Sequence, residues 1–148
     1  MTYQSAAGYA GDLLAAEAYR LLASQQDATL IDVRTQPEWV YVGAPDLRSL
    51  GKNVLFLEWQ SFPSMAVDPQ FTERLGAMLG DAGVPGGAPL VFLCRSGARS
   101  RQAAIAMTAT GRGPCFNVVD GFEGPLDPAG HRSVLGGWKA GGLPWAQT

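Results

Sequence analysis

The chain has 148 residues and a formal net charge of −2 at pH 7, and 47% of its residues are hydrophobic. This length fits one domain, residues 1–148, which can bury roughly 68–70% of the surface of its unfolded chain. Without a basic face, the composition excludes nucleic acid and anionic membrane as bulk partners. We find no signal-peptide pattern of a basic region followed by an apolar run, and no stretch of about 18 apolar residues that could span a membrane. We therefore expect a cytoplasmic protein.

The predicted helices and strands alternate along the chain. In chain order we expect a helix over 13–24, a strand over 29–33, a one-turn helix over 35–38, a strand over 53–57, a helix over 70–80 capped by Asp68 and Pro69, a strand over 90–93, a helix over 101–110 and a strand over 115–119. Short apolar strands separated by helices indicate a parallel sheet covered on both faces.

The aromatic residues outside these elements have two possible roles. Trp138 and Trp145, with Leu135 and Leu143, are expected to anchor a closing helix onto the sheet. A second group either packs inside or forms an apolar rim, and the sequence leaves both options open for Trp59, Phe62 and Met65.

The segment that begins at Cys94 carries most of the functional information. Cys94 ends the apolar run 89–93 and is followed by Arg95, Ser96, Gly97, Ala98, Arg99 and Ser100. A strand that ends at a thiol and turns through small residues into a helix places the sulfur in a cradle of backbone N–H groups. Helix N-termini and neighbouring arginines stabilise a thiolate, so the pattern favours a nucleophile at Cys94.

The length of this loop restricts the size of the anion that it can bind. Four residues separate Cys94 from Arg99, one fewer than in loops that embrace phosphate, and a smaller ring suits a smaller anion such as a persulfide sulfur. Ligands of parallel sheets bind beyond the carboxyl ends of the strands, where Cys94 is predicted to lie. The alternative is a buried structural cysteine, which would not require Gly97 and two flanking arginines.

The second cysteine and the single histidine complete the list of reactive side chains. Cys115 is assigned to core packing beside Phe116, and His131 is a candidate that could reach the site from a glycine-rich loop. Neither a disulfide framework nor a metal site is indicated, so we expect reduced thiols, no metal and no cofactor.

Three segments together resemble the single-domain rhodaneses, the thiosulfate:cyanide sulfurtransferase family. They are residues 30–34 (Leu-Ile-Asp-Val-Arg), the pair Glu38-Trp39 and the loop from Cys94 to Ser100. The resemblance covers roughly residues 10–145 and implies an α/β, three-layer rhodanese-like fold, in which a central parallel five-stranded sheet carries helices on both faces.

The same resemblance implies the chemistry. Cys94 would cycle between thiolate and persulfide, the amides of residues 95–99 would form the cradle, and Arg95 and Arg99 would contact the substrate anion. The donor would be thiosulfate or another small sulfane-sulfur anion, and the acceptor cyanide or a thiol, including a protein thiol. We expect substrate binding from the whole loop, Arg95, Ser96, Gly97, Ala98, Arg99 and Ser100.

Other residues receive secondary roles. Asp32 and Arg34 are interpreted as a structural pair, and Glu38 is a candidate that lies near the site or a first-turn glutamate favoured by the helix dipole. Segments 43–52 and 120–137 depart from the family pattern and bear on the choice of substrate. Two other functions stay open: a carrier or partner-binding module without turnover, and a phosphatase or arsenate reductase with a related cysteine loop.

Overall fold

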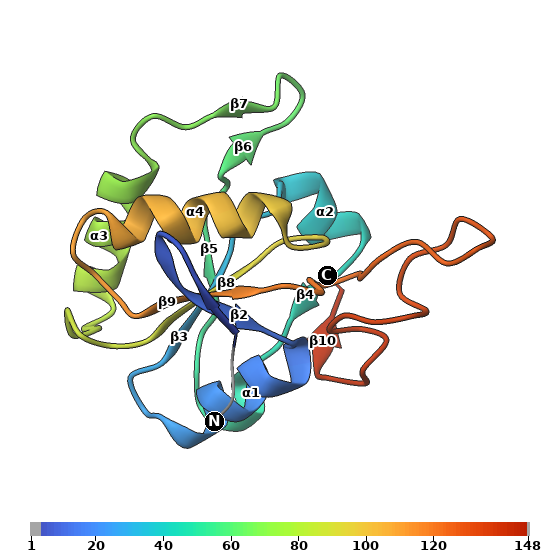
Figure 1. The fold of residues 1–148 in the computed structure, drawn as a ribbon, viewed down its shortest axis with the longest axis horizontal. Coiled ribbons are helices and arrows are strands. Elements are labelled where there is room, and N and C mark those ends of the chain that lie inside the picture. Colours follow the sequence, from blue (N-terminus) through green and yellow to red (C-terminus); the bar gives the residue numbers. More distant parts are fainter. Residues whose placement is uncertain (1–3, 148) are drawn as a thin grey trace.

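The computed structural model describes residues 4–147, and a six-stranded sheet lies at its centre (Figure 1). The strands stand in the order β1-β2-β9-β8-β3-β5. Their bounds are Gln4–Ala6 for β1, Tyr9–Leu13 for β2, Thr29–Asp32 for β3, Leu55–Phe56 for β5, Leu90–Leu93 for β8 and Cys115–Val118 for β9. The five strands from β2 to β5 run parallel, and β1 adds an antiparallel edge. The predicted parallel five-stranded sheet is confirmed.

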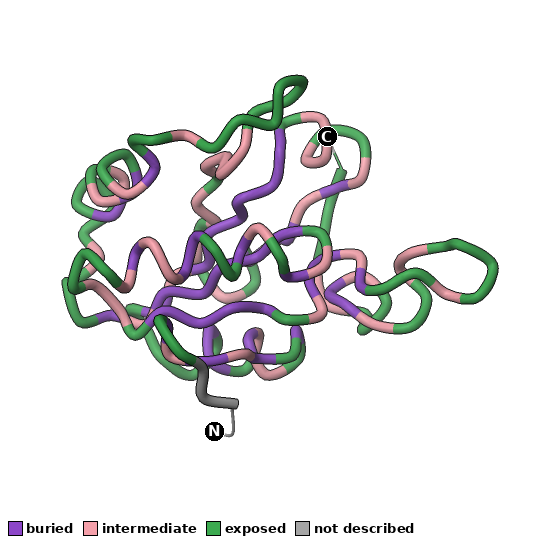
Figure 2. Tube along the Cα trace, turned by 45° about the horizontal axis from the view of Figure 1, so that its top comes forward, coloured by how far each residue is buried: buried purple, intermediate pink, exposed green. Residues whose placement is uncertain are grey.

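Helices cover both faces of the sheet, as predicted. Helix α1 (Ala15–Ser24) packs on one face, and α3 (Phe71–Asp81) and α4 (Ala98–Thr108) pack on the other. The short helices α2 (Gln36–Tyr41) and η1 (Arg48–Leu50) lie in the connection from β3 to β5. Figure 2 shows the buried strands between these layers, whereas the loops at the edges of the molecule are exposed.

The alternation of side chains along β8 determines which layer receives the functional cysteine. Val91 and Leu93 belong to the core under α1, whereas Phe92 and Cys94 belong to the core under α3 and α4. Successive strand residues face opposite sides of a sheet, and this alternation extends one residue beyond the end of β8. The Cys94 side chain therefore lies on the face that α4 covers.

The structure corrects the sequence-based prediction at one strand, one helix start and one helix cap. Strand β2 was missed, because its Gly11 and Asp12 are residue types that strands usually avoid. Helix α4 begins before Arg101, because Gly97 caps it in a left-handed conformation. Asp68 is not the cap of α3: its carboxylate instead accepts the Gln70 N–H at 2.9 Å in the preceding turn.

The C-terminal segment also differs from its prediction. Among residues 4–147, no helix follows α4; the chain instead turns repeatedly and ends in β10 (Trp145–Ala146), which pairs with β4 (Ala44–Pro45). Trp138 is still an anchor, fully buried and donating its indole N–H to the Pro144 carbonyl at 2.7 Å. Leu135 is no anchor, since 61% of it is exposed. The many glycines in this segment favour turns over a helix.

A hairpin that the sequence did not predict projects from the α3/α4 side of the molecule (Figure 1). Its strands are β6 (Gln60–Ser61) and β7 (Ala66–Val67). Trp59, at its base, packs edge-to-face on Phe71 with ring centroids 5.0 Å apart, whereas Phe62 at its tip is exposed. Trp59 therefore packs inside, whereas Phe62 does not.

None of the helices described between residues 4 and 147 combines the length and the apolar character that crossing a membrane would require.

Candidate active site

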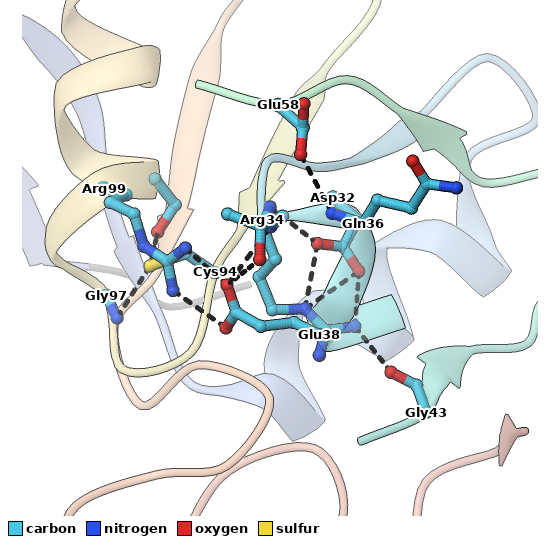
Figure 3. A network of polar contacts seen from close by, with 11 residues as sticks. Asp32, Arg34, Gln36, Glu38, Gly43, Glu58, Cys94, Gly97 and Arg99 are labelled. Atoms are coloured by element: carbon cyan, nitrogen blue, oxygen red, sulfur yellow. Dashed lines mark hydrogen bonds and ion pairs between the residues drawn. The ribbon is translucent and has the colours of Figure 1, made fainter. Parts of the chain in front are cut away.

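Cys94 lies at the carboxyl end of β8, directly before the turn into α4. Its residue surface is 1% exposed, and two groups lie within hydrogen-bonding distance of its sulfur. The Gly97 N–H donates to Sγ at 3.1 Å, and the Ser100 hydroxyl lies 3.1 Å from Sγ (Figure 3). Both groups belong to the N-terminal end of α4, where the helix dipole favours negative charge. The arrangement can therefore hold a sulfur anion.

The loop after Cys94 rests on the turn that follows β9. The Phe122 N–H donates to the Cys94 carbonyl at 2.8 Å, and the Glu123 N–H donates to the Arg95 carbonyl at 3.0 Å. Gly97 has a φ of 103°, and a Cβ there would meet the Val119 carbonyl oxygen at 2.5 Å. Only glycine fits this combination of left-handed backbone and close approach.

A pocket of about 590 Å³ opens beside the cysteine. Its walls come from the cysteine loop, from α2, from the β6–β7 hairpin and from the C-terminal segment. The lining residues are Glu38, Val42, Gln60, Met65, Cys94, Arg95, Ser96, Ala98, Arg99, Glu123 and Arg132. Three arginines and two glutamates give this set a small positive excess, which suits a small anion.

Arg99 is held by Glu38 through two parallel hydrogen bonds. Nη1 donates to Oε1 at 2.6 Å and Nη2 to Oε2 at 3.0 Å, and both side chains are mostly buried (Figure 3). Burial alone would raise the pKa of Glu38, but the hydrogen bonds and charge of Arg99, with the Thr35 N–H and hydroxyl, lower it to about 2. Arg99 is thus oriented across the pocket, and part of its charge is already neutralised.

Asp32 and Arg34 form a fully buried ion pair below the site. Arg34 Nη2 donates to the Asp32 carboxylate at 2.8 Å and to the Gly43 carbonyl at 2.9 Å, and its guanidinium stacks on the Phe122 ring at 4.2 Å. These contacts join β3, the segment after α2 and the turn after β9, which is the geometry of a structural pair.

The structure places the remaining predicted residues as follows. Arg95, Ser96 and Ala98 line the pocket with Glu38, whereas His131 is exposed and is absent from the described lining. The His131 N–H donates to Asp127 Oδ1 at 2.7 Å, and the chain instead presents the adjacent Arg132 to the pocket.

Cys115 is buried at the opposite end of the sheet, because it opens β9 beside Leu90 of the parallel strand β8. Burial raises the pKa of its thiol, which agrees with core packing.

Several lining residues were not found from the sequence. Arg132 and Glu123 lie in an irregular segment without periodicity, and Gln60 lies in the unpredicted hairpin. Met65, for which packing and an apolar rim were both left open, lines the pocket from the same hairpin. Among residues 4–147, no group of three or more histidine, cysteine, aspartate or glutamate side chains is arranged to hold a metal ion.

Comparison with known proteins assigns the family. The model of the rhodanese-like domain matches residues 14–125, which include the cysteine loop and the Asp32–Arg34 pair. The chain belongs to the rhodanese-like family. Rv0390 from M. tuberculosis, known from a crystal structure, is similar to this rhodanese-like chain: the TM-score is 0.83 and the identity 43%, over 95% of this chain and 99% of Rv0390.

Two further proteins are similar to this chain. The uncharacterized protein RC0915 of Rickettsia conorii is 37% identical over 134 residues, 90% of this chain and 95% of that protein. A polysulfide-sulfur transferase homodimer from Wolinella succinogenes shares the fold, with a TM-score of 0.56 and 24% identity over 93% of this chain and 78% of the other.

Proposed function

We propose that this protein is a sulfurtransferase that carries a sulfane sulfur as a persulfide on Cys94. The observation that carries the proposal is the position of Cys94: the residue lines the pocket at the N-terminal end of α4, and the Gly97 N–H donates to its Sγ. Membership of the rhodanese-like family and the shared fold with a polysulfide-sulfur transferase support the same reaction type.

The reaction has two halves, and Cys94 takes part in both. The Cys94 thiolate attacks the outer sulfur of thiosulfate, the S–S bond of thiosulfate breaks, and sulfite leaves with the bonding electron pair. The enzyme then holds a Cys94 persulfide anion. An acceptor such as cyanide attacks the outer persulfide sulfur, which leaves as thiocyanate and returns the thiolate; a thiol acceptor leaves as a persulfide in the same way.

The surrounding residues divide the work of holding anions. The Gly97 amide and the other amides of the loop, residues 95–99, are proposed to stabilise the persulfide, since α4 directs its positive end there. Arg95 and Arg132 are the lining arginines without a close carboxylate partner in the described part of the chain, so we assign to them the first contact with the donor. Arg99, paired with Glu38, contributes less charge.

Intact mass spectrometry tests this proposal directly. The wild type, Cys94→Ser and Cys115→Ser are incubated briefly with thiosulfate, and each is weighed before and after cyanide. The wild type and Cys115→Ser should gain one sulfur atom and lose it to cyanide, whereas Cys94→Ser should gain none. Cys115→Ser is the matched control, because its thiol is buried at the other end of the sheet.

The other results separate the alternatives. A persulfide that forms on Cys94 but is transferred to no small acceptor would identify a carrier whose acceptor is a protein thiol. No sulfur gain from thiosulfate or polysulfide, with Cys94 still open to alkylation, would overturn sulfur transfer and favour phosphate or arsenate substrates.

A further inference from the structure

The pocket beside Cys94 is larger than a small sulfur donor requires. Its volume of about 590 Å³ lies within the range of pockets that bind drug-sized ligands, roughly 300–1,000 Å³, whereas thiosulfate is close to sulfate in size. The pocket therefore has room for a larger molecule beside the reacting sulfur.

Three charged residues line this pocket from adjacent segments of backbone. They are Arg95 in the cysteine loop, Glu123 in the turn after β9 and Arg132 in the returning part of the C-terminal segment. The Glu123 N–H donates to the Arg95 carbonyl at 3.0 Å, and the Ser133 N–H donates to the Glu123 carbonyl at 2.6 Å. The three segments thus lie side by side, and the charges that they carry alternate in sign.

Arg132 is held on one side and available on the other. Its Nη1 donates to the Gly124 carbonyl at 2.8 Å, and its other guanidinium N–H groups have no protein acceptor within residues 4–147. Gly124 is itself fixed, because it has a φ of 71° and a Cβ there would meet the Gly136 carbonyl oxygen. The guanidinium is half-buried and lines the pocket, so it can receive a carboxylate there.

Glu123 is the pocket carboxylate that is left for a cation. Glu38, the other one, is already bound to Arg99 by two hydrogen bonds. In the part of the chain that the structure describes, the half-buried Glu123 carboxylate has neither a hydrogen-bond donor nor an ion-pair partner. A ligand with an ammonium group would supply that partner.

The same pocket also has an apolar lining. Val42, at the end of α2, and Met65, in the β6–β7 hairpin, both line it. Their side chains can pack against methylene groups, and methionine adapts easily to the shape of what it contacts. The pocket thus combines an anion site, a cation site and an apolar surface beside one cysteine.

We propose that Glu123 and Arg132 select the sulfur acceptor, and that this acceptor is a small thiol with an α-amino-acid head group. Its ammonium would contact Glu123, its carboxylate Arg132, and its apolar part Val42 and Met65. Cyanide and uncharged thiols react without this binding energy. The inference deepens the proposed function and rests on it for the persulfide at Cys94.

The acceptor can use the same arginine as the donor, because the two occupy the pocket in turn. Sulfite leaves before the acceptor enters, so Arg132 is available again. The acceptor thiol releases its proton to water, and its thiolate attacks the outer sulfur of the Cys94 persulfide. The S–S bond breaks, the bonding electron pair returns to Cys94 as a thiolate, and the acceptor leaves as a persulfide.

Single-turnover transfer to a matched set of thiols tests the inference. Cysteine carries both charges, 3-mercaptopropionate the carboxylate alone, cysteamine the ammonium alone and 2-mercaptoethanol neither. The wild type is loaded with thiosulfate or polysulfide and desalted, and the loss of one sulfur is followed by intact mass. Each rate constant, expressed per thiolate, is divided by that of the same thiol with a small disulfide, which removes differences in intrinsic nucleophilicity.

The corrected rate for cysteine should exceed that for 2-mercaptoethanol by at least about tenfold, as charge-assisted hydrogen bonds predict. Relative to 2-mercaptoethanol, Arg132→Gln should lose about tenfold with the two thiols that carry a carboxylate, and Glu123→Gln the same with the two that carry an ammonium. Arg132→Lys should recover part of the loss, because it keeps the charge without the planar fork. Arg20→Gln, the same charge change at an exposed arginine on α1, should keep the wild-type ratios.

The other outcomes are distinct. Equal corrected rates for the four thiols in the wild type overturn the inference, and so does a loss in both pocket variants that is the same for every thiol. A loss in Arg20→Gln as large as in Arg132→Gln also overturns it, because net charge alone would then explain the rates. Failure of the persulfide to form is seen before any thiol is added, and it overturns the proposed function itself.

Discussion

Replacement of Glu38 by glutamine should destabilise the protein by an amount that depends on pH. The carboxylate has a pKa of about 2 in the folded chain against 4.5 for its ordinary value. At about 1.4 kcal/mol per pKa unit, this lowering corresponds to about 3 kcal/mol. Its side chain is 18% exposed and that of Arg99 16%, so we expect solvent screening to leave about 2 kcal/mol.

The sign of the pH dependence follows from the direction of the shift. A depressed folded pKa gives stabilisation that is complete above 4.5, declines below it and is lost as the pH falls through 2. Urea denaturation of the wild type and Glu38→Gln should therefore differ most at neutral pH and converge in acid. Other carboxylates titrate in both proteins, so the difference isolates Glu38.

The exposed pair Asp46–Arg48 provides the matched control. Arg48 donates two parallel hydrogen bonds to Asp46, from Nε to Oδ1 at 3.0 Å and from Nη2 to Oδ2 at 2.7 Å, and the side chain of this arginine is 83% exposed. Asp46→Asn should leave the unfolding curve nearly unchanged, because water screens this pair. The result that would refute this reasoning is a difference in the free energy of unfolding, between the wild type and Glu38→Gln, that stays constant from neutral pH down to about pH 2. The stabilisation would then not come from the ionised carboxylate.

Three further substitutions test the support of the site. Asp32→Ala leaves the Arg34 charge buried and should lower the free energy of unfolding by about 3–5 kcal/mol; a loss within error would show that the charge finds another partner. Gly121→Ala places a Cβ against the backbone of the cysteine loop and should reduce persulfide loading, whereas Gly76→Ala, on the open side of α3, should not. Trp138→Ala should cost about 3–5 kcal/mol in urea denaturation, and a smaller loss would mean that the turn around it collapses into the cavity.

The parts of the fold that sequence reasoning found are those with a strong local pattern. The run before Cys94 is continuously apolar, and the run at 29–33 contains the apolar residues Leu30, Ile31 and Val33; each contains a central strand. Strand β2 was missed because aspartate is typical of turns rather than strands. The half-buried Asp12 is accommodated in the strand because Asn117, on the adjacent strand, and the Tyr9 hydroxyl both donate to its Oδ1.

The same limit applies to the site. The cysteine loop is contiguous, so its residues could be named in advance, and Glu38 was a candidate through its place in a short motif. Arg132 was missed in favour of the adjacent His131, because an irregular loop has no period from which the direction of a side chain follows. In such a loop, the sequence can indicate the segment that reaches the pocket but not which of two adjacent residues lines it.

The support of the cysteine loop by the turn after β9 limits how this site can change during evolution. Gly97 faces the Val119 carbonyl, and Gly121 contacts the backbone of Arg95 and Ser96, so the ring is filled from behind. A single residue inserted into the loop between Cys94 and Arg99 would enlarge this loop only if the loop moved away from the turn after β9. A change from a sulfur guest to a larger oxyanion therefore needs coordinated changes in two segments that are distant in sequence, so no single insertion offers a gradual route between the two chemistries.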